Sequence, residues 1–272
     1  MLKVAPSAYY AWQQRHQVPA LEPAWQLAVR TAFQRHGRRY GTRRLRAELQ
    51  AEGHTVGRTR IRRTLAAHGL RAQPPRSFVP RTTDSDPARC LIPNHLLGQS
   101  ASTEPNQVGV GDITCLPKQG GGWLCLATWL DRYWRKVVGW ELRETMPEDL
   151  VSEALRRAQA VRQPATGLVI HSDQGSQYAA TLFRELVARH QALPSMSRRG
   201  NCYDNAHAGS FWSRLKTERL DGGSFPSLAE ARLEISHYLA YYNAERRHSA
   251  LGYQSPNHFE THFQTTSQRC PA

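Results

Sequence analysis

The sequence predicts a mixed α/β domain that follows a small all-helical domain. Apolar residues recur at spacings of three and four over residues 21–69, and a Pro-rich stretch then interrupts the chain. Beyond this stretch, strand-like apolar segments alternate with helical patterns. These three observations divide the 272 residues into an all-helical domain (1–72), a partly extended, mobile linker (73–105) and an α/β domain (106–272).

Three short helices are predicted in the first domain. The first covers residues 21–36 and ends at Gly37, and the second follows Thr42 as its N-cap and ends at Gly53. A third helix ends at Gly69 and completes the pattern of a helix-turn-helix. A recognition helix in the major groove needs cations opposite the phosphates. The expected DNA contacts are Arg43, Arg44, Arg58, Arg60, Arg62 and Arg63.

Positive charge is concentrated in the first third of the chain. The net charge is +14, and residues 1–100 contain 17 Lys and Arg against 5 Asp and Glu, whereas the remaining 172 residues contain 19 against 17. A basic segment beside a nearly neutral body indicates a polyanion partner, and we expect double-stranded DNA. The alternative is a generally basic protein whose arginines form a solvated helix face.

Several classes of protein are excluded by what the sequence lacks. No apolar run approaches the roughly 18 residues of a membrane span, and the first residues lack the apolar segment of a signal peptide. The five cysteines form no CxxC pair, and the 12 histidines do not gather at zinc-ligand spacing. We therefore expect a cytoplasmic protein with reduced thiols and without a membrane partner, a zinc site or an organic cofactor.

The second domain begins with three predicted strands and ends with helices. Apolar segments at residues 108–112, 123–130 and 137–140, joined by short turns, predict an antiparallel meander. A helix beginning near Pro147 leads to a short strand at residues 168–170. Further helices are predicted over residues 178–190, 205–220 and 228–242.

Two aspartates in this domain suggest a metal site. Asp112 lies inside an apolar strand, where a carboxylate is costly without a partner, and Asp173 directly follows a buried strand. Either residue alone is better explained by capping or turn formation. Carboxylates on neighbouring strands repel each other unless a cation lies between them, and Mg²⁺ prefers such oxygen ligands. Together with the basic first domain, the pair indicates metal-assisted phosphoryl chemistry on a nucleic acid.

Seven short motifs follow one another along the chain. They are residues 7–12, residues 39–45 in the helix-turn-helix, residues 106–108 with Gly111-Asp112-Ile113-Thr114, residues 130–133 with 135–140, residues 171–178 with Asp173, residues 200–206, and a closing block of residues 241–243, Arg246 and residues 248–253. In these motifs and in their order, nearly the whole chain resembles the OrfB subunit of bacterial insertion-sequence transposases, which are made as paired OrfA and OrfB frames and belong to the retroviral-integrase-like superfamily.

The resemblance implies an RNase H-like integrase core, which is a mixed sheet with flanking helices, and an Asp-Asp-Glu metal site. It implies Mg²⁺, replaceable by Mn²⁺, at Asp112 and Asp173, and cleavage at a transposon end followed by attack of the freed 3′-OH on another phosphodiester. Two metal ions then activate the attacking oxygen and stabilise the leaving one. The implied partners are transposon-end and target DNA, OrfA or an OrfA-OrfB fusion, and further copies of the chain, in the bacterial cytoplasm and on the nucleoid. Lys216, Arg246 and His248 are the implied DNA contacts in this domain.

One residue departs from the family pattern at the catalytic site. Where the family has its third carboxylate, separated from Asp173 by 35 intervening residues, this chain has Gly209. Glu218 lies about on the opposite face of the helix, and Asp204, more than a turn away, is expected to cap it. Gly109 and Cys115 also replace larger side chains of the family, which thins the packing around Asp112.

Two functions therefore stay open. The chain is either a DDE-type transposase or a catalytically dead DNA-binding remnant that occupies transposon ends, and Gly209 is the residue that separates them. An unrelated RNase H-like nuclease is disfavoured by the closing block. Met1 opening directly onto the OrfB region fits a separate reading frame, although a fusion to OrfA is also open.

Overall fold

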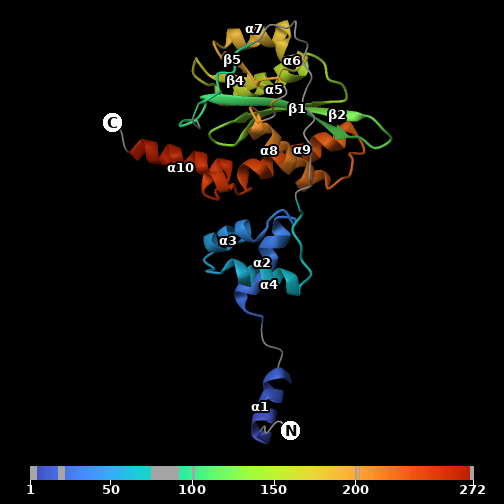
Figure 1. The fold of residues 1–272 in the computed structure, drawn as a ribbon, viewed down its shortest axis with the longest axis vertical. Coiled ribbons are helices and arrows are strands. Elements are labelled where there is room, and N and C mark those ends of the chain that lie inside the picture. The colour runs from blue at the N-terminus through green and yellow to red at the C-terminus, as the bar shows by residue number, and fades with distance from the viewer. Residues whose placement is uncertain are drawn as a thin grey trace. The chain divides into compact units, whose positions relative to one another are not determined.

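The computed structural model describes residues 5–17, 22–74, 92–99, 102–199, 201 and 203–269. It divides the chain into two compact units, Met1–Gln73 and Pro74–Ala272 (Figure 1). No helix within the described ranges is both long and apolar enough to cross a membrane.

The first unit contains the three predicted helices. They are α2 (Ala24–Arg35), α3 (Thr42–Ala51) and α4 (Arg58–Ala67), and their apolar faces enclose a core that includes Phe33, Leu49 and Ile61. Thr42 is the first residue of α3 and not its N-cap, which is Gly41 without a side-chain cap. The unit also contains α1 (Pro6–Gln17), which the sequence did not predict.

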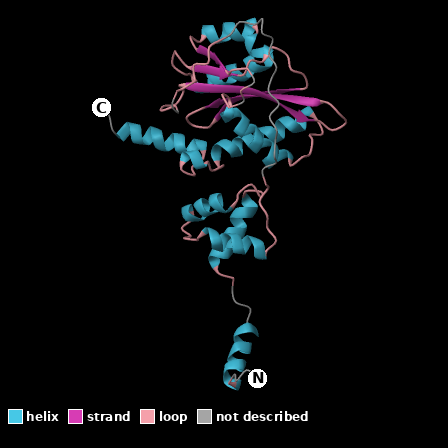
Figure 2. Ribbon diagram, in the orientation of Figure 1, coloured by secondary structure: helices cyan, strands magenta, loops and turns pink. Residues whose placement is uncertain are grey.

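The second unit is built on a mixed five-stranded sheet with the order β3-β2-β1-β4-β5 (Figure 2). The predicted antiparallel meander of β1, β2 and β3 is confirmed, and β4 pairs parallel to β1. A fifth strand, parallel to β4, was not predicted. The bounds are β1 (Val108–Pro117), β2 (Trp123–Asp131), β3 (Val137–Arg143), β4 (Val169–Ser172) and β5 (Leu193–Met196).

Helices cover both faces of this sheet (Figure 1). One apolar cluster joins the sheet to α5 (Asp149–Arg162) and α7 (Thr181–Arg189), with α6 (Ser176–Ala179) beside them. A second cluster joins the other face to α8 (Ala206–Leu215), the π-helical turn η1 (Lys216–Leu220) and α9 (Leu228–Ala244). The chain continues through the short helix η2 (Ser249–Leu251) to α10 (Pro256–Arg269).

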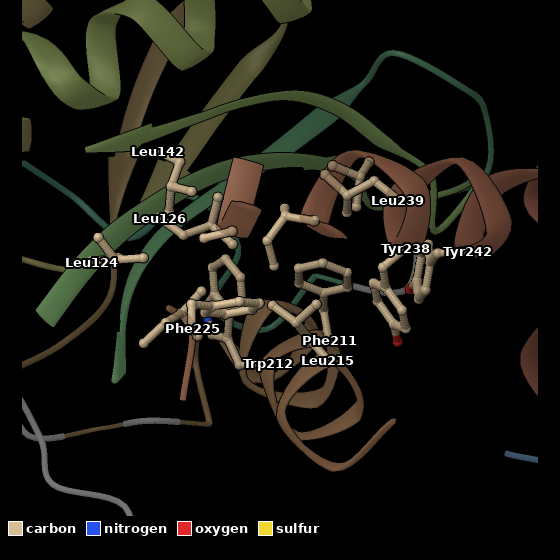
Figure 3. Packing of buried hydrophobic residues seen from close by; sticks show 14 of the residues in the cluster. Leu124, Leu126, Leu142, Phe211, Trp212, Leu215, Phe225, Tyr238, Leu239 and Tyr242 are labelled. Atoms are coloured by element: carbon tan, nitrogen blue, oxygen red, sulfur yellow. The ribbon is translucent and has the colours of Figure 1, made fainter. Parts of the chain in front are cut away.

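The second cluster fixes how α8 lies on the sheet. Phe211, Trp212 and Leu215 of α8 are buried against Leu126 of β2 and Tyr242 of α9 (Figure 3). These apolar positions recur three and four residues apart, which gives α8 one buried side and two flanks. The burial of this side decides which residues of α8 can face the neighbouring strands β1 and β4 in the middle of the sheet.

Part of the segment expected as a linker belongs to the second unit. The amide of Asn94 donates to Asp204 at 2.9 Å, the backbone N–H of His95 donates to Ser195 Oγ at 3.0 Å, and Leu96 packs against the core. Residues 92–99 are therefore docked rather than mobile. Residues 75–91 of the expected linker lie outside the described residues.

Candidate active site

Asp112 and Asp173 lie at matching positions of neighbouring strands: Asp112 is in the middle of β1, and Asp173 directly follows β4. In the parallel pair of β1 and β4, Val110 is opposite His171, and two residues further along each chain come Asp112 and Asp173. Side chains alternate between the two faces of a sheet with a period of two. Asp112 faces α8, and Asp173 follows at the matching position of the neighbouring strand, although 60 residues separate the two in the chain.

The Asp112 carboxyl is half-buried and interacts electrostatically with Asp173. Burial and, after it, the negative charge of Asp173 together raise the pKa of Asp112 to about 7. Hydrogen bonds from Ile113 N–H at 2.8 Å and from Trp212, together with the charge of Lys216, oppose this shift in pKa. Two carboxylates whose negative charges interact in this way form an environment that a cation stabilises.

Helix α8 contributes a polar flank to the same site. The indole Nε1 of Trp212 donates to Oδ2 of Asp112 at 3.0 Å. Burial lowers the pKa of the Lys216 ammonium, while the nearby Cys115 and Asp112 oppose that shift. At about 100° per residue, Gly209 lies on the same side of the helix as Trp212 and Lys216. Position 209 thus belongs to the side of α8 that contacts Asp112.

Gly209 leaves room for a side chain at this position. The residue is exposed, and a β-carbon built on it would meet no atom within 4 Å. In the part of the chain that the structure describes, no group of three or more His, Cys, Asp or Glu side chains could hold a metal ion. A larger side chain at position 209 would therefore enter open space.

Neither neighbouring acid takes the place of the absent carboxylate. Asp204 accepts hydrogen bonds from the backbone and guanidinium of Arg198 at 2.9 to 3.0 Å, and these bonds lower its pKa. The prediction that Asp204 caps α8 is wrong, because the N-cap is Asn205 and makes no side-chain cap bond. Glu218 is buried in η1 and accepts a hydrogen bond from Tyr238 at 3.1 Å.

Arg246 does not face DNA. Its side chain is 2% exposed, and its guanidinium donates to Glu218 at 2.6 and 2.9 Å. Burial alone would lower the pKa of Arg246, but the hydrogen bonds with Glu218 raise it. The expectation that Arg246 contacts DNA is therefore wrong. His248 is half-buried, and its ring lies edge-on to Tyr242 with centroids 4.8 Å apart.

The arginines of the first unit lie outside its core. Buried Ile61 and Leu65 fix the inner side of α4, which leaves its arginines on the other sides. Arg44 of α3 is half-buried, with its guanidinium 5.8 Å from the centre of the Tyr40 ring. The fully exposed arginines among the predicted DNA contacts are Arg43, Arg58, Arg60, Arg62 and Arg63.

Two aromatic residues of the site escaped the sequence analysis. Trp212 holds Asp112 through its indole N–H, and buried Tyr178 lies near both aspartates. Burial raises the pKa of the Tyr178 phenol well above its usual value, and the charges of Asp112 and Asp173 add to this effect. Trp212 could have been predicted from the sequence, because a residue three positions after Gly209 lies on the same side of a helix. Tyr178 gave no such signal, because a buried aromatic residue is ordinary in a core.

Comparison with known proteins agrees with this architecture. Residues 102–202 and 190–256 match two family models described as an integrase core domain, and residues 24–78 match an HTH-like domain. The chain is 39% identical to a 31 kDa protein of insertion element IS600 from Shigella sonnei, over 96% of each chain. It is 35% identical to the transposase InsF of IS3A from Escherichia coli K12, over 96% of this chain and 91% of the relative.

A solved structure matches more distantly. The catalytic core domain of HTLV-2 integrase, in complex with magnesium, is 18% identical with a TM-score of 0.44, over 57% of this chain and 95% of that chain. A similarity of this size carries no functional information. The family models and the five-stranded mixed sheet define an integrase-core protein with an RNase H-like fold and an N-terminal HTH-like domain. The extensive identity to InsF shows that the chain belongs to the insertion-sequence transposases.

Proposed function

We propose that this chain is built for metal-dependent DNA strand cleavage and 3′-OH strand transfer at insertion-sequence ends, as a DDE-type polynucleotidyl transferase. The observation that carries this proposal is the pair of Asp112 and Asp173 at matching positions of two neighbouring strands, beside Trp212 of α8 and Lys216 of the turn that follows it. Membership of the transposase family supports it.

The donor set suits one divalent cation. Mg²⁺ is commonly held by one or two carboxylates and completes its shell with water and substrate phosphate oxygens. Asp112 and Asp173 would hold the ion, with Mg²⁺ as the expected metal and Mn²⁺ as its substitute. When bound, the metal supplies Lewis-acid activation of the attacking oxygen and charge stabilisation at the scissile phosphate.

The surrounding residues position the carboxylates and the DNA. The N–H groups of Trp212 and Ile113 each donate to a different oxygen of Asp112, which fixes the carboxylate against the strand. Lys216 offers an ammonium group to a DNA phosphate on the same flank of α8, and His248 stays a proposed contact. The arginine-bearing faces of α3 and α4 would bind the duplex backbone, so residues 1–72 act as the DNA-binding domain and residues 106–272 as the catalytic core.

Gly209 is proposed to impair the reaction severely. Without a third carboxylate, one of the two metal positions expected from the family loses a ligand. Metal stabilisation contributes several kcal/mol to such transition states, and about 1.4 kcal/mol corresponds to tenfold in rate, so we expect a loss of about a thousandfold or more. The same observation favours the second candidate, a DNA-binding remnant that occupies transposon ends without cleaving them.

The proposed setting follows from the family. Partners would be double-stranded DNA at transposon ends and targets, OrfA or an OrfA-OrfB fusion, and further copies of this chain on DNA. Such a protein would act in the bacterial cytoplasm, where the nucleoid lies.

A strand-transfer assay tests this function. Labelled duplexes carrying the element's ends, taken from the DNA flanking the gene, are incubated with Mg²⁺ and the unaltered protein, Gly209→Glu or Gly209→Gln. We expect transfer to recover about a thousandfold in Gly209→Glu alone, because glutamine matches the size of glutamate without its charge. Filter binding should give equal DNA affinities for all three proteins. Efficient transfer by the unaltered protein would contradict the impairment, and an inactive Gly209→Glu that still binds DNA would favour the remnant.

A further inference from the structure

Two arginines and a histidine gather beside the first turn of α8. The ring nitrogen Nε2 of His207 accepts hydrogen bonds from Arg135 at 3.0 Å and from Arg132 at 3.4 Å, and Arg135 also contacts Nδ1 of the same ring. We refer to Arg132, Arg135 and His207 as the arginine–histidine cluster. All three residues are half-buried, so the cluster is partly open to solvent.

The cluster lies on a different flank of α8 from the aspartate pair. His207 is about 200° around the helix from Gly209 and about 180° from Lys216. Arg132 follows β2, and its backbone N–H donates to Val108 at the start of β1, 3.0 Å away. The cluster is therefore a separate feature from the proposed metal site, on the same helix and the same face of the sheet.

No carboxylate neutralises the two guanidinium groups. Within the described ranges neither arginine of the cluster forms an ion pair, whereas the adjacent Lys136 pairs with Glu260 at 2.6 Å. The neighbouring acid, Asp131, is occupied otherwise. Its two oxygens accept the backbone N–H groups of Asn106, Tyr133 and Trp134 at 2.8 to 2.9 Å. The cluster thus combines two positive charges with an imidazole acceptor and no anion.

Without a bound anion, the surroundings of the cluster disfavour the charged forms of Arg135 and His207. Burial lowers the pKa of Arg135, and the charge of Arg132 adds to this effect, while Tyr242 and, to a smaller extent, Asp131 oppose it. Burial also lowers the pKa of His207 to about 4, with both arginines adding to the effect, so the imidazole is neutral at pH 7. Half-buried charges without a counter-charge are costly, which points to a ligand that supplies negative charge.

The backbone at Arg135 supports a role for its side chain. Its φ of 57° is in the left-handed region, which favours glycine in the turn between β2 and β3. An arginine here carries a conformational cost that glycine would not. Residues in such strained backbone conformations commonly occur at binding sites, where the side chain has a function.

We propose that the arginine–histidine cluster binds a backbone phosphate of a DNA strand, at a position distinct from the Asp112 and Asp173 pair. Guanidinium groups match phosphate oxygens in charge and in planar, forked geometry. Phosphate contacts of this kind hold DNA in register without reading its sequence. The anion site follows from the cluster alone. Only the assignment of that anion to a DNA phosphate rests on the proposed function.

Thermal unfolding with inorganic phosphate tests the anion site alone. We compare the unaltered full chain, the double variant Arg132→Gln/Arg135→Gln, and the control Arg189→Gln on α7, in phosphate and in chloride of equal ionic strength. Phosphate should raise the Tm of the unaltered protein and the control more than that of the double variant. An equal phosphate effect in all three proteins would overturn the proposal, whatever the outcome of the strand-transfer assay.

DNA binding by the same three proteins tests the ligand. Each neutralised phosphate contributes about 0.9 to the slope of log affinity against log salt. The double variant should lose about 1 from this slope, while Arg189→Gln keeps the slope of the unaltered protein. A lost phosphate effect with an unchanged DNA slope would overturn the assignment to DNA. A change in oligomeric state of the double variant, without a change in slope, would instead assign the cluster to a contact with a second copy.

Discussion

At the scale of single residues, two glycines of β1 differ in the room around their backbones. A β-carbon on Gly111 would lie 2.4 Å from the Trp129 ring, whereas one on Gly109 would lie 3.8 Å from Ile170 in ordinary contact. Gly109 also lines a cavity of about 30 Å³ next to Trp129. A small side chain at position 109 would partly fill this gap.

These contacts predict opposite effects for two alanine substitutions on one strand. Gly111→Ala forces Trp129 out of place and should lower the free energy of unfolding by about 1–3 kcal/mol. Gly109→Ala adds a methyl group in ordinary van der Waals contact and restricts the unfolded chain, so we expect a gain of about 0.4–1 kcal/mol. Urea unfolding of both variants measures the difference. Equal midpoints for the two would contradict the close approach of Trp129 to Gly111.

The candidate site was partly predictable residue by residue. Asp112 and Asp173 stood out because a carboxylate is costly at the places where they occur. Gly209 stood out through the spacing of the family's motif. Arg246 was misassigned because the sequence gives its charge but not its burial, and only the folded chain shows its pairing with Glu218. Charge alone does not distinguish a DNA contact from an internal ion pair.

At the scale of elements, the π-helical turn η1 depends on that ion pair. Glu218 of η1 is joined to Arg246, which follows α9, and to Tyr238 within α9. The turn begins at Lys216, so the ion pair fixes the end of α8 that carries the proposed DNA-contacting lysine. Sequence analysis predicted one continuous helix over residues 205–220, because local spacing does not reveal a turn that a distant arginine stabilises.

Removing one partner of this ion pair should lower the free energy of unfolding far more than replacing both partners with apolar residues. Arg246→Ala leaves the Glu218 carboxylate buried without its cation and should lower the free energy of unfolding by about 3–5 kcal/mol. The double variant Glu218→Leu/Arg246→Met removes both charges and should recover most of that loss. Urea unfolding measures both changes. A single variant as stable as the unaltered protein would show that the pair is open to solvent.

Other elements were predictable to different degrees. The alternation of the first three strands and the apolar stripe of α5 follow from burial on the sheet, and both were recognised. Strand β5 escaped because it has only four residues and includes Pro194. Helix α10 escaped because its sequence is largely polar, and it is held by Phe259 and Phe263 packing against Trp134 across the fold.

At the scale of the whole molecule, the proposed DNA-binding arginines and the proposed metal ligands belong to different units. The exposed arginines of α3 and α4 are in the first unit, whereas Asp112 and Asp173 are in the second. DNA affinity and strand chemistry should therefore respond to different substitutions. This separation is why a chain that lacks one carboxylate would still bind DNA.

Salt-dependent binding of the full chain tests that separation. Arg62→Gln/Arg63→Gln on α4 should lower the slope of log DNA affinity against log salt by about 1–2, since each lost phosphate contact contributes about 0.9. Arg184→Gln/Arg189→Gln on α7 removes the same charge from exposed positions and should leave the slope unchanged. Fluorescence anisotropy over a KCl series measures both. Equal losses in the two variants would mean that overall charge, and not the helix-turn-helix, determines binding.

We propose that a carboxylate at position 209 would complete the metal site formed by Asp112 and Asp173. Calorimetric measurement of Mn²⁺ affinity in the absence of DNA is the direct test. The account predicts that Gly209→Glu binds Mn²⁺ at least about tenfold more tightly than the unaltered protein, which corresponds to about 1.4 kcal/mol. Gly209→Gln should show no such gain, and adding Asp112→Asn to Gly209→Glu should abolish it. Equal Mn²⁺ affinity of the unaltered protein and Gly209→Glu would contradict the account, because position 209 would then lie outside the metal site.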